Sequence, residues 1–491
     1  MGPICPQPPD FIIPLTQSED CLNLNVVRPQ GVQAHDKLPV MVWIYGGGLY
    51  TGSINDTIYN PDALVHQSVE KDTPIIFVAM NYRLNIFGFA LSEALRTNNS
   101  LNVGLKDQRL ALEWVQKNIE FFGGDPERVT IFGQSSGGLS VGIQILAYGG
   151  TRPVPFHAGI MESTALEPTS TSNFSLVAYN GVAQLAGCNT FGDPQSPDTL
   201  ACLRALPFED LLNFTITQHD STADQNDGDI YLPTVDDDFL PQASSELARQ
   251  GLFPKIPIII GWTNNDAASF TPSTIQTPAD TFSFVQLYWQ GLTNDSIATI
   301  LSLYPSADFP AHPSTNHSSE FYRSAQIFRD ILFTCPSFYL GSAMAQKYFA
   351  DGEDPKVFYY NQNQTILQTD VDAGLGVTHT SELAYVFSNF SAWDAHPTKS
   401  DIELQKRESG SWISFAYTGA PSVAKRGTLE GWKPAYMSGN ATDASVYIIG
   451  GPNSGLSKLE AKGAKEALAK QRLKERCEFL NTPELVEQLQ Y

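Results

Sequence analysis

The sequence predicts an α/β fold, in which a mostly parallel sheet is covered by helices. Two apolar runs, Leu38–Tyr45 and Pro74–Tyr82, are bounded by turn residues and have the pattern of strands buried on both faces. An amphipathic helix is expected over Asp107–Phe122, where apolar residues recur at helical spacing. Strands and helices continue to alternate along the chain, which is typical of a parallel sheet whose strands are joined by helices.

The elements after this helix are expected in the same alternation. A Gly-Gly-Asp-Pro turn at 123–126 ends the helix, and the apolar run Val129–Phe132 forms the next strand. The Ala-, Lys- and Glu-rich stretch Ser457–Leu489 indicates a closing helix. Three more strands are expected at His157–Met161, Pro257–Gly261 and Lys356–Tyr360.

The chain is expected to form a single α/β domain, residues 1–491, with large helical insertions. Of its 491 residues, 42% are hydrophobic and 11% aromatic, enough for one sizeable core, and no linker, repeat or low-complexity stretch divides it. Short helical patterns concentrate in residues 165–250 and 267–355. These two regions would cover the sheet.

Charge and motifs argue against several kinds of partner. The formal net charge of −22 disfavours binding to nucleic acid or to an anionic membrane surface, because both repel an acidic protein. No apolar run approaches the roughly 20 residues of a membrane span. No cysteine pair has the CxxC spacing of a zinc or redox site. We therefore expect neither a metal nor a cofactor, and the sequence does not indicate an oligomeric state.

Cysteines and sequons indicate an extracellular protein. The six cysteines favour structural disulfides, although all fifteen connectivities remain open. Asn-x-Ser/Thr sequons exceed the roughly three or four expected by chance. The first residues of the chain have neither the charged nor the apolar region of a signal peptide. The nine sequons are at Asn55, Asn98, Asn173, Asn213, Asn294, Asn316, Asn363, Asn389 and Asn440.

Residues 133–137, Gly-Gln-Ser-Ser-Gly, place a serine on a sharp turn between the Val129–Phe132 strand and a following helix. Such a turn leaves no room for side chains two residues before and after the serine, so Gly133 and Gly137 are both needed. The hydroxyl of Ser135 would then stand clear of the sheet at a helix N-terminus, where negative charge is favoured. Ser135 is therefore the candidate nucleophile.

A nucleophilic serine also needs donors for an oxyanion, and a glycine triplet supplies candidates. Gly46, Gly47 and Gly48 directly follow the Leu38–Tyr45 strand, and three glycines let backbone N–H groups approach a substrate oxygen. The backbone N–H of Ser136 is a third candidate donor. The alternative is a plain flexible turn.

Serine catalysis usually employs a histidine as the base. If the order along the chain is serine, acid, histidine, then His312, His317, His379 and His396 remain as candidates. His317 lies within a sequon and His312 in a proline-flanked loop, and both contexts are typical of the surface. His379 instead lies in a glycine-bearing loop that leads into an apolar helix. It is the preferred candidate.

The acid is expected after a strand that lies between the serine and the histidine. The Pro257–Gly261 strand leads into a loop that contains Asp266. An aspartate there could also be a helix N-cap. Asp330 and Asp372 compete for the role, so the residues alone favour Asp266 only modestly.

The chain resembles the type-B carboxylesterase/lipase family, the cholinesterase-like branch of the α/β-hydrolases. The matches run in order over nearly the whole chain, which makes the resemblance highly specific. The matching segments are Ser18–Val26, Val40–Gly48, Asn81–Arg83, Asn102–Gln108, Phe122–Pro126, Gly133–Gly137, Gly261–Asp266 and Gly376–Glu382.

The resemblance implies an α/β-hydrolase fold and assigns roles residue by residue. It puts the nucleophile at Ser135, the acid at Asp266 and the base at His379. Ser163 and Glu382 match a buried serine and a buried glutamate that support the histidine. The implied oxyanion donors are Gly47, Gly48 and Ser136, and the implied disulfides are Cys5–Cys21, Cys188–Cys202 and Cys335–Cys477.

The chain departs from the family pattern close to the serine. Gln134 and Ser136 stand where Glu and Ala are usual, which removes a carboxylate beside the site, and we expect the Ser136 side chain to be tolerated. Asp266 stands where Glu is frequent, so its loop must lie closer to the histidine. Thr380 follows the histidine where Gly is usual.

The N-terminal part of the chain also departs from the pattern. The loop Pro6–Asp20 holds Phe11 as its one aromatic residue and lacks the tryptophan of choline-type esterases, so a choline substrate is not expected. The loop is also short for the lid of an interfacial lipase. The family has a hairpin and early strands before the first cysteine, which this chain lacks, so we expect a fragment or a truncated gene model.

The leading hypothesis is a secreted serine carboxylesterase that hydrolyses small-molecule esters through an acyl-enzyme. A lipase that acts on longer acyl chains is one alternative. A non-catalytic, adhesion-type relative is another, although such relatives typically lack one member of the catalytic triad and this chain has a candidate for each. A third is an active enzyme whose shortened chain folds poorly.

Overall fold

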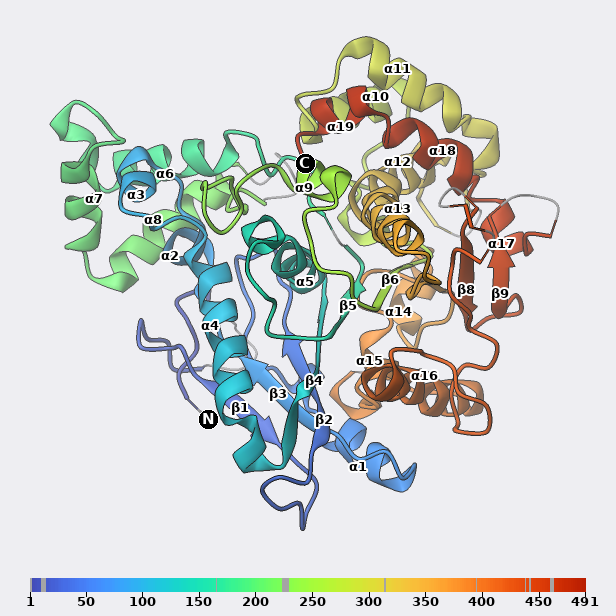
Figure 1. Cartoon of the computed structure of the whole chain (residues 1–491). Coiled ribbons are helices and arrows are strands. Elements are labelled where there is room, and N and C mark those ends of the chain that lie inside the picture. Colours follow the sequence, from blue (N-terminus) through green and yellow to red (C-terminus); the bar gives the residue numbers. More distant parts are fainter. Residues whose placement is uncertain are drawn as a thin grey trace.

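Nine strands of the described part of the chain form one sheet, in the order β1-β3-β2-β4-β5-β6-β7-β8-β9 (Figure 1). The outer pairs β1–β3 and β8–β9 are antiparallel and the other neighbours are parallel, which confirms the expected mostly parallel sheet. The computed structural model describes residues 2–9, 15–164, 166–222, 229–312, 315–393, 395–437, 439–440, 443–459 and 463–491. The strands are β1 (Leu24–Val27), β2 (Leu38–Ile44), β3 (Ile76–Met80), β4 (Gly124–Gln134), β5 (Ala158–Glu162), β6 (Ile258–Thr263), β7 (Val357–Gln362), β8 (Ser445–Ile449) and β9 (Gly455–Lys458).

Strands β3, β5, β6 and β7 are buried on both faces because their sequences are apolar except at the carboxyl ends, where β5 ends in Glu162 and β7 in Asn361 and Gln362. Every residue of β3, β5, β6 and β7 is buried. Their register brings three carboxyl ends level, since Gln134 of β4 pairs with Glu162 of β5, which pairs with Gly261 of β6. The loops that leave these strands therefore begin at one edge of the sheet, where open α/β sheets form their ligand sites.

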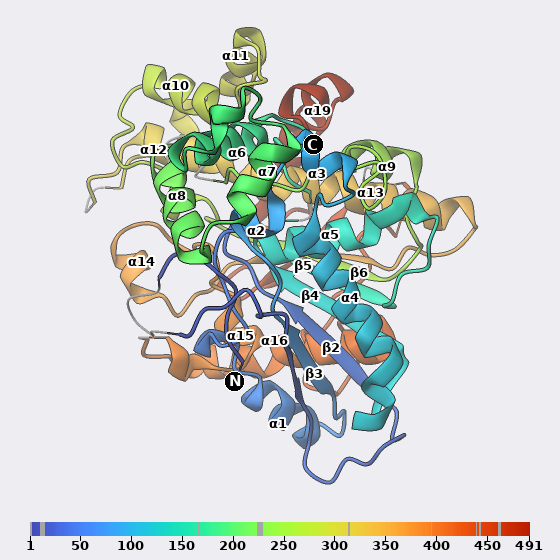
Figure 2. The ribbon, with the colours of Figure 1, turned by 90° about the vertical axis from the view of Figure 1, so that its left-hand side faces the viewer.

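Helices cover both faces of the sheet (Figures 1 and 2). One face is covered by α4 (Val103–Asn118), α5 (Ser136–Leu146) and α13 (Cys335–Ala350). The other is covered by α16 (Lys399–Thr418), with α1 (Asp62–Glu70) beside it. Every residue of α5 is buried, because this helix is enclosed between the sheet and the neighbouring helices.

The two regions expected to cover the sheet are helical. Figure 1 shows α6–α8 and α10–α12 as two groups beyond the sheet, on opposite sides of the molecule. In residues 165–250 the helices are α6 (Phe174–Leu185), α7 (Pro197–Arg204), α8 (Phe208–Asp220) and α9 (Ser244–Gln250). In residues 267–355, α10 (Pro278–Tyr288), α11 (Asn294–Leu303) and α12 (Ser319–Arg329) precede α13. Shorter helices are α2 (Asn85–Phe89), α3 (Glu93–Thr97), α14 (Gln368–Asp372) and α15 (Leu383–Val386).

The prediction of one closing helix over Ser457–Leu489 is wrong. Its first residues belong to strand β9, and residues 460–462 lie outside the described part of the chain. Further on, Arg472 has a left-handed backbone with φ 46°, and Pro483 lacks the N–H that a continuing helix would need. The segment therefore forms three short helices, α17 (Glu466–Ala469), α18 (Leu473–Leu480) and α19 (Pro483–Leu489).

Three disulfides cross-link this fold, two of them locally and one between parts that are distant in the chain. They are Cys5–Cys21, Cys188–Cys202 and Cys335–Cys477, which are the pairs that the family resemblance implies. The third joins the first residue of α13 to α18. Within the described ranges, no helix is both long and apolar enough to cross a membrane.

Candidate active site

Ser135 lies on a strained turn between β4 and α5. Its backbone has φ 58° and ψ −132°, which directs the side chain away from the strand. A Cβ atom on Gly133 would lie 2.5 Å from the carbonyl oxygen of Gly137, and one on Gly137 would lie 2.1 Å from that of Ile44. Both glycines are therefore required, because backbone atoms occupy the space that a side chain would need.

His379 and Asp266 meet at the carboxyl edge of the sheet. The Oδ1 atom of Asp266 lies 2.5 Å from Nδ1 of His379. The Asp266 side chain is fully buried, and its Oδ2 atom accepts a hydrogen bond from the backbone N–H of Thr263 at the end of β6. The rings of Phe270 and Phe333 pack against the imidazole, at centroid distances of 5.2 and 5.1 Å. Nδ1 is thus the protonated nitrogen that faces the carboxylate, and Nε2 carries the lone pair.

The Nε2 atom of His379 faces the turn that carries Ser135. The side-chain amide nitrogen of Gln134 lies 3.0 Å from Nε2. Among the hydrogen bonds of the described residues, none joins Nε2 to the Ser135 hydroxyl. Both Ser135 and His379 line a cavity of about 500 Å³. A histidine whose Nε2 faces this turn can act as a base for the serine once its lone pair is released.

The glycine loop after β2 packs directly on this turn. Gly47 and Gly48 have left-handed backbones, with φ 106° and 62°, and both line the cavity. The Ser136 hydroxyl accepts a hydrogen bond of 3.1 Å from the backbone N–H of Leu49. A Cβ atom on Gly46 would lie 2.5 Å from the Gln134 carbonyl oxygen. The Ser136 side chain therefore anchors the glycine loop, a role that its position in the sequence did not indicate.

Aromatic, aliphatic and polar side chains line the cavity together. The ring of Tyr50 stacks on that of His219, with centroids 4.0 Å apart and planes 7° apart. Phe270 also lines the cavity, as does the helical turn Asp330–Thr334, which contributes Leu332 and Phe333. Two carboxylates, Glu167 and Asp229, also line the cavity. The cavity has the size and the mixed apolar and polar walls of a small-molecule site.

Three buried glutamates lie behind the site. The Ser163 hydroxyl donates to Glu382 at 3.4 Å, and the Trp412 indole donates to Glu162 at 2.7 Å. Glu408 is the third, and all three side chains are fully buried. Burial raises the pKa of Glu162 to about 8 and the pKa values of Glu382 and Glu408 well above the usual range.

Sequence reasoning named Ser163 and Glu382 but missed Glu162, Glu408 and Trp412. Glu162 ends an apolar strand, which is a place where an unpaired charge is costly. Its position at the end of an apolar strand was the one feature of the sequence that could have indicated a buried carboxyl. The contact between Glu162 and Trp412 spans 250 positions and left no pattern in the sequence.

The competing candidates lie elsewhere in the fold. Asp330 is bound to the Arg329 guanidinium at 2.6 Å and to the Tyr304 hydroxyl at 2.8 Å. Asp372 is exposed on α14. His317 stacks on the ring of Phe321 in α12. His312 and His396 are exposed. Phe11, the aromatic residue of the first disulfide loop, lies outside the described residues.

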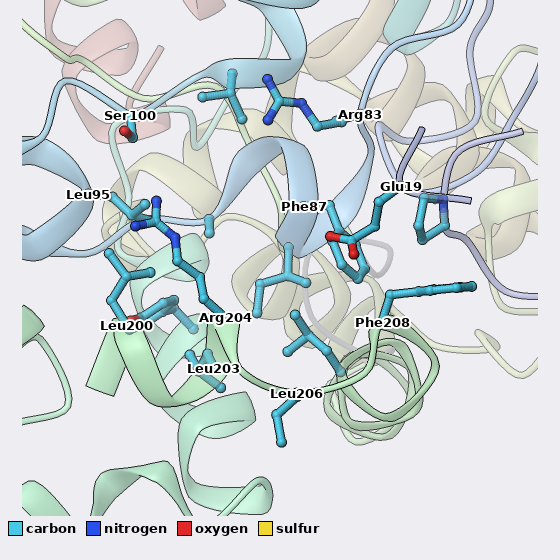
Figure 3. A pocket seen from close by; sticks show the side chains of 16 residues that line it. Glu19, Arg83, Phe87, Leu95, Ser100, Leu200, Leu203, Arg204, Leu206 and Phe208 are labelled. Atoms are coloured by element: carbon cyan, nitrogen blue, oxygen red, sulfur yellow. The ribbon is translucent and has the colours of Figure 1, made fainter. Parts of the chain in front are cut away.

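A second cavity, of about 320 Å³, lies away from this site and is lined by no histidine (Figure 3). Its lining includes Leu200 and Leu203 of α7, Phe208 of α8 and Phe87 of α2. Arg83, on its rim, is held by Asp107 at 2.7 Å. The ester chemistry implied by the sequence therefore has its candidate groups in the first cavity and not in this one. Likewise, no group of three His, Cys, Asp or Glu side chains in the described ranges could hold a metal ion.

A serine turn at the end of a central parallel strand, facing a histidine that a buried carboxylate holds, is the arrangement of the α/β-hydrolases. Comparison with known proteins narrows this class. The model of the Carboxylesterase family matches residues 1–473, and the chain belongs to this family of carboxylic ester hydrolases.

Relatives and solved structures agree with this assignment. A secreted lipase of Arthroderma benhamiae is 45% identical over 100% of this chain and 86% of its own length. An inactive carboxylesterase-like protein of Byssochlamys spectabilis is 35% identical, over 89% of this chain and 77% of its own. The crystal structure of Aspergillus niger EstA superposes with a TM-score of 0.81 at 26% identity, covering 100% of this chain and 88% of that one.

Proposed function

We propose that this chain is a serine esterase in which Ser135 is the nucleophile, His379 the base and Asp266 the acid. The observation that carries the proposal is the 2.5 Å contact between Asp266 and Nδ1 of His379, which leaves Nε2 directed at the turn of Ser135. Family membership makes an ester the substrate. No step of this chemistry needs a metal or a cofactor.

In the proposed reaction, Nε2 of His379 takes the proton of the Ser135 hydroxyl while Oγ attacks the ester carbonyl carbon. The negative charge that develops on the carbonyl oxygen is stabilised by the backbone N–H groups of Gly47, Gly48 and Ser136. The C–O bond to the alcohol then breaks, and the alcohol leaves with the proton from the imidazolium. Water, deprotonated by His379, attacks the acyl-enzyme, and Ser135 regains its proton as the carboxylic acid departs.

Hydrolysis of p-nitrophenyl butyrate tests the proposal. We expect turnover by the wild type and a loss of at least 10³-fold, on the order of what removing a triad serine costs, in Ser135→Ala. The control is Ser302→Ala on α11, an exposed serine outside the cavity, which is expected to retain full activity. Equal turnover by the wild type and Ser135→Ala would overturn the assignment of the nucleophile.

A lipase is the second candidate, since a secreted lipase is 45% identical over the whole chain. We expect short-chain esters to be preferred, because a cavity of about 500 Å³ has the size of a small-molecule site. Esters of two to sixteen acyl carbons distinguish the two. A rate that rises steadily with chain length, and rises again above the substrate's solubility limit, would favour the lipase.

An extracellular location is also proposed. Three disulfides indicate an oxidising compartment. Two similar proteins, from Arthroderma benhamiae and Gibberella zeae, are named as secreted lipases. Six of the nine sequon asparagines are exposed and thus accessible to glycosylation: Asn98, Asn173, Asn213, Asn294, Asn316 and Asn440. A mobility shift on treatment of the naturally produced protein with an endoglycosidase would support the proposal, and free thiols in that protein would contradict it.

A further inference from the structure

Gln134 contacts Nε2 of His379, the atom that the proposed reaction requires as the base. It is the last residue of β4 and directly precedes Ser135, and 2% of it is exposed. Its amide nitrogen lies 3.0 Å from Nε2 of His379. An amide nitrogen is a donor only, and Nε2 is an acceptor while Asp266 holds the proton on Nδ1. The contact is therefore a hydrogen bond from Gln134 to the lone pair of the neutral imidazole.

The same lone pair must take the proton of Ser135. In the described structure, the base is bonded to the side chain before the serine and not to the serine itself. The amide and the hydroxyl come from adjacent residues on one turn, so a rotation of the Gln134 side chain would free Nε2 next to the serine.

We propose that Gln134 is a positioning residue that holds Nε2 of His379 in the empty site and releases it to Ser135 when substrate binds. Because the amide is neutral and donates to the lone pair, it also favours the neutral imidazole, which is the form that can act as a base. This inference rests on the proposed serine mechanism. It adds a residue at which this chain has an amide and the family usually has a carboxylate. The type of this side chain sets the lowest pH at which the site remains active.

The other titratable groups near the imidazole make an amide at this position important. Asp266 contacts Nδ1 directly, and Glu382, at the start of α15, lies close enough to Asp266 to interact electrostatically with it. Glu167 and Asp229 line the same cavity, and His219 of α8 is the one other ionisable base in its lining. A carboxylate in place of the Gln134 amide would add one more negative charge, in direct contact with the ring. It would stabilise the imidazolium, and that form has no lone pair to offer.

Three side chains can be compared at position 134: the native amide, the carboxylate of a glutamate and the thioether of a methionine. They differ in the forms of histidine that they can bond. While Asp266 holds the proton on Nδ1, a carboxylate at position 134 bonds Nε2 only in the imidazolium, and a thioether is at most a weak acceptor. The amide bonds the neutral ring through its N–H and, after rotating by half a turn, the imidazolium through its oxygen. We therefore expect the carboxylate to be the one side chain of the three that shifts the histidine clearly towards the imidazolium.

The test is the pH dependence of kcat/KM for p-nitrophenyl acetate between pH 4 and 9, in the wild type, Gln134→Met and Gln134→Glu. The midpoint of the acid limb is expected at a higher pH in Gln134→Glu than in the wild type and in Gln134→Met, because only the glutamate adds a negative charge beside the ring. The shift should be about one pH unit or more, on the order of what an adjacent carboxylate produces. Gln286→Glu, an exposed glutamine on α10, adds the same charge far from the cavity and should leave the acid limb unchanged.

Acid limbs that coincide within about 0.2 pH units in all three proteins would overturn the inference, since a merely structural role does not move them. Failure of the serine mechanism is seen separately, as full activity of Ser135→Ala. A second measurement needs no variant at position 134. In a crystal structure of the wild type carrying a short phosphonate on Ser135 Oγ, the Gln134 amide is expected to have left Nε2. An amide still bonded to Nε2 in that adduct would contradict the release.

Discussion

The Oδ1 atom of Asp266 lies 2.5 Å from Nδ1 of His379, although 113 positions separate the two residues in the chain. The loop after β6 holds the carboxylate in place, because its second oxygen accepts the backbone N–H of Thr263. The aspartate side chain is fully buried, and 8% of that of the histidine is exposed. The pair is therefore held in a nearly dry setting, in which a charge-assisted hydrogen bond is strong.

Asp266→Asn tests what this contact does. In this variant the amide oxygen can still accept the hydrogen bond from Thr263, which leaves the amide NH₂ group facing Nδ1 of the histidine. An NH₂ group donates and does not accept, so the imidazole is expected to move its proton from Nδ1 to Nε2. We predict a fall in kcat on the order of 10³–10⁴-fold with little change in folding. The measurement is kcat for a p-nitrophenyl ester together with the circular dichroism spectrum. A folded Asp266→Asn variant with wild-type kcat would remove Asp266 from the mechanism.

The hydrogen bond from Leu49 to the Ser136 hydroxyl connects the glycine loop to the serine turn. Ser136→Ala removes the acceptor but keeps the backbone N–H that is proposed to stabilise the oxyanion. Since one hydrogen bond contributes about 0.5–1.5 kcal/mol, kcat should fall about 2- to 10-fold while KM stays within a factor of two. A rise in KM at constant kcat would instead mean that the side chain contacts the bound substrate.

The buried carboxyl of Glu162 should make the free energy of unfolding depend on pH. Burial raises the pKa of its carboxyl from 4.5 to about 8, so the folded protein binds this proton more tightly than the unfolded chain does. The associated stability is fully present below about pH 4.5 and is lost as the pH rises towards 8. Over this window each such group lowers the free energy of unfolding by up to about 1.4 kcal/mol per pH unit.

Glu162→Gln isolates this effect, because the amide oxygen can still accept the hydrogen bond from Trp412. Urea unfolding between pH 5 and 8 should show a shallower decline in stability for the variant than for the wild type. Glu478→Gln, on the exposed side of α18, is the control and should follow the wild type. Parallel declines in the wild type and Glu162→Gln would show that Glu162 is ionised in the fold at neutral pH.

The disulfides should differ in what they contribute to stability. Cys335–Cys477 closes a separation of 142 residues and Cys188–Cys202 one of 14. Because a longer closed loop removes more entropy from the unfolded chain, replacing the first pair by alanines should cost about 5 kcal/mol and the second about 3. Urea midpoints of the two double variants test this order. A larger loss from the Cys188–Cys202 pair would mean that strain or local packing outweighs loop entropy.

Much of the fold follows from local sequence patterns. The runs expected to be central strands correspond to β2 to β7, because a strand buried on both faces appears in the sequence as a nearly continuous apolar run. Strands β1, β8 and β9 were not predicted. They lie at the two sides of the sheet, where β1 is half-buried along its length and pairing with a neighbour decides the structure. The predicted C-terminal helix is too long because composition alone does not reveal the left-handed break at Arg472.

The candidate site is only partly visible in the sequence. The serine turn and the glycine triplet are local motifs, so their residues can be named from the amino-acid sequence alone. The choice of Asp266 over Asp330 and Asp372 needs the family resemblance, since all three are plausible from the residues alone. The contact of Gln134 with His379 joins residues 245 positions apart and cannot be inferred from spacing.

The role of Ser135 as nucleophile is tested most directly by labelling the wild-type protein with a fluorophosphonate and locating the adduct by peptide mass spectrometry. We predict one phosphonyl group per chain on Ser135, loss of ester hydrolysis in proportion to labelling, and no adduct in Ser135→Ala. An adduct on another residue that abolishes activity, or full ester hydrolysis by a protein that is completely labelled at Ser135, would contradict this role.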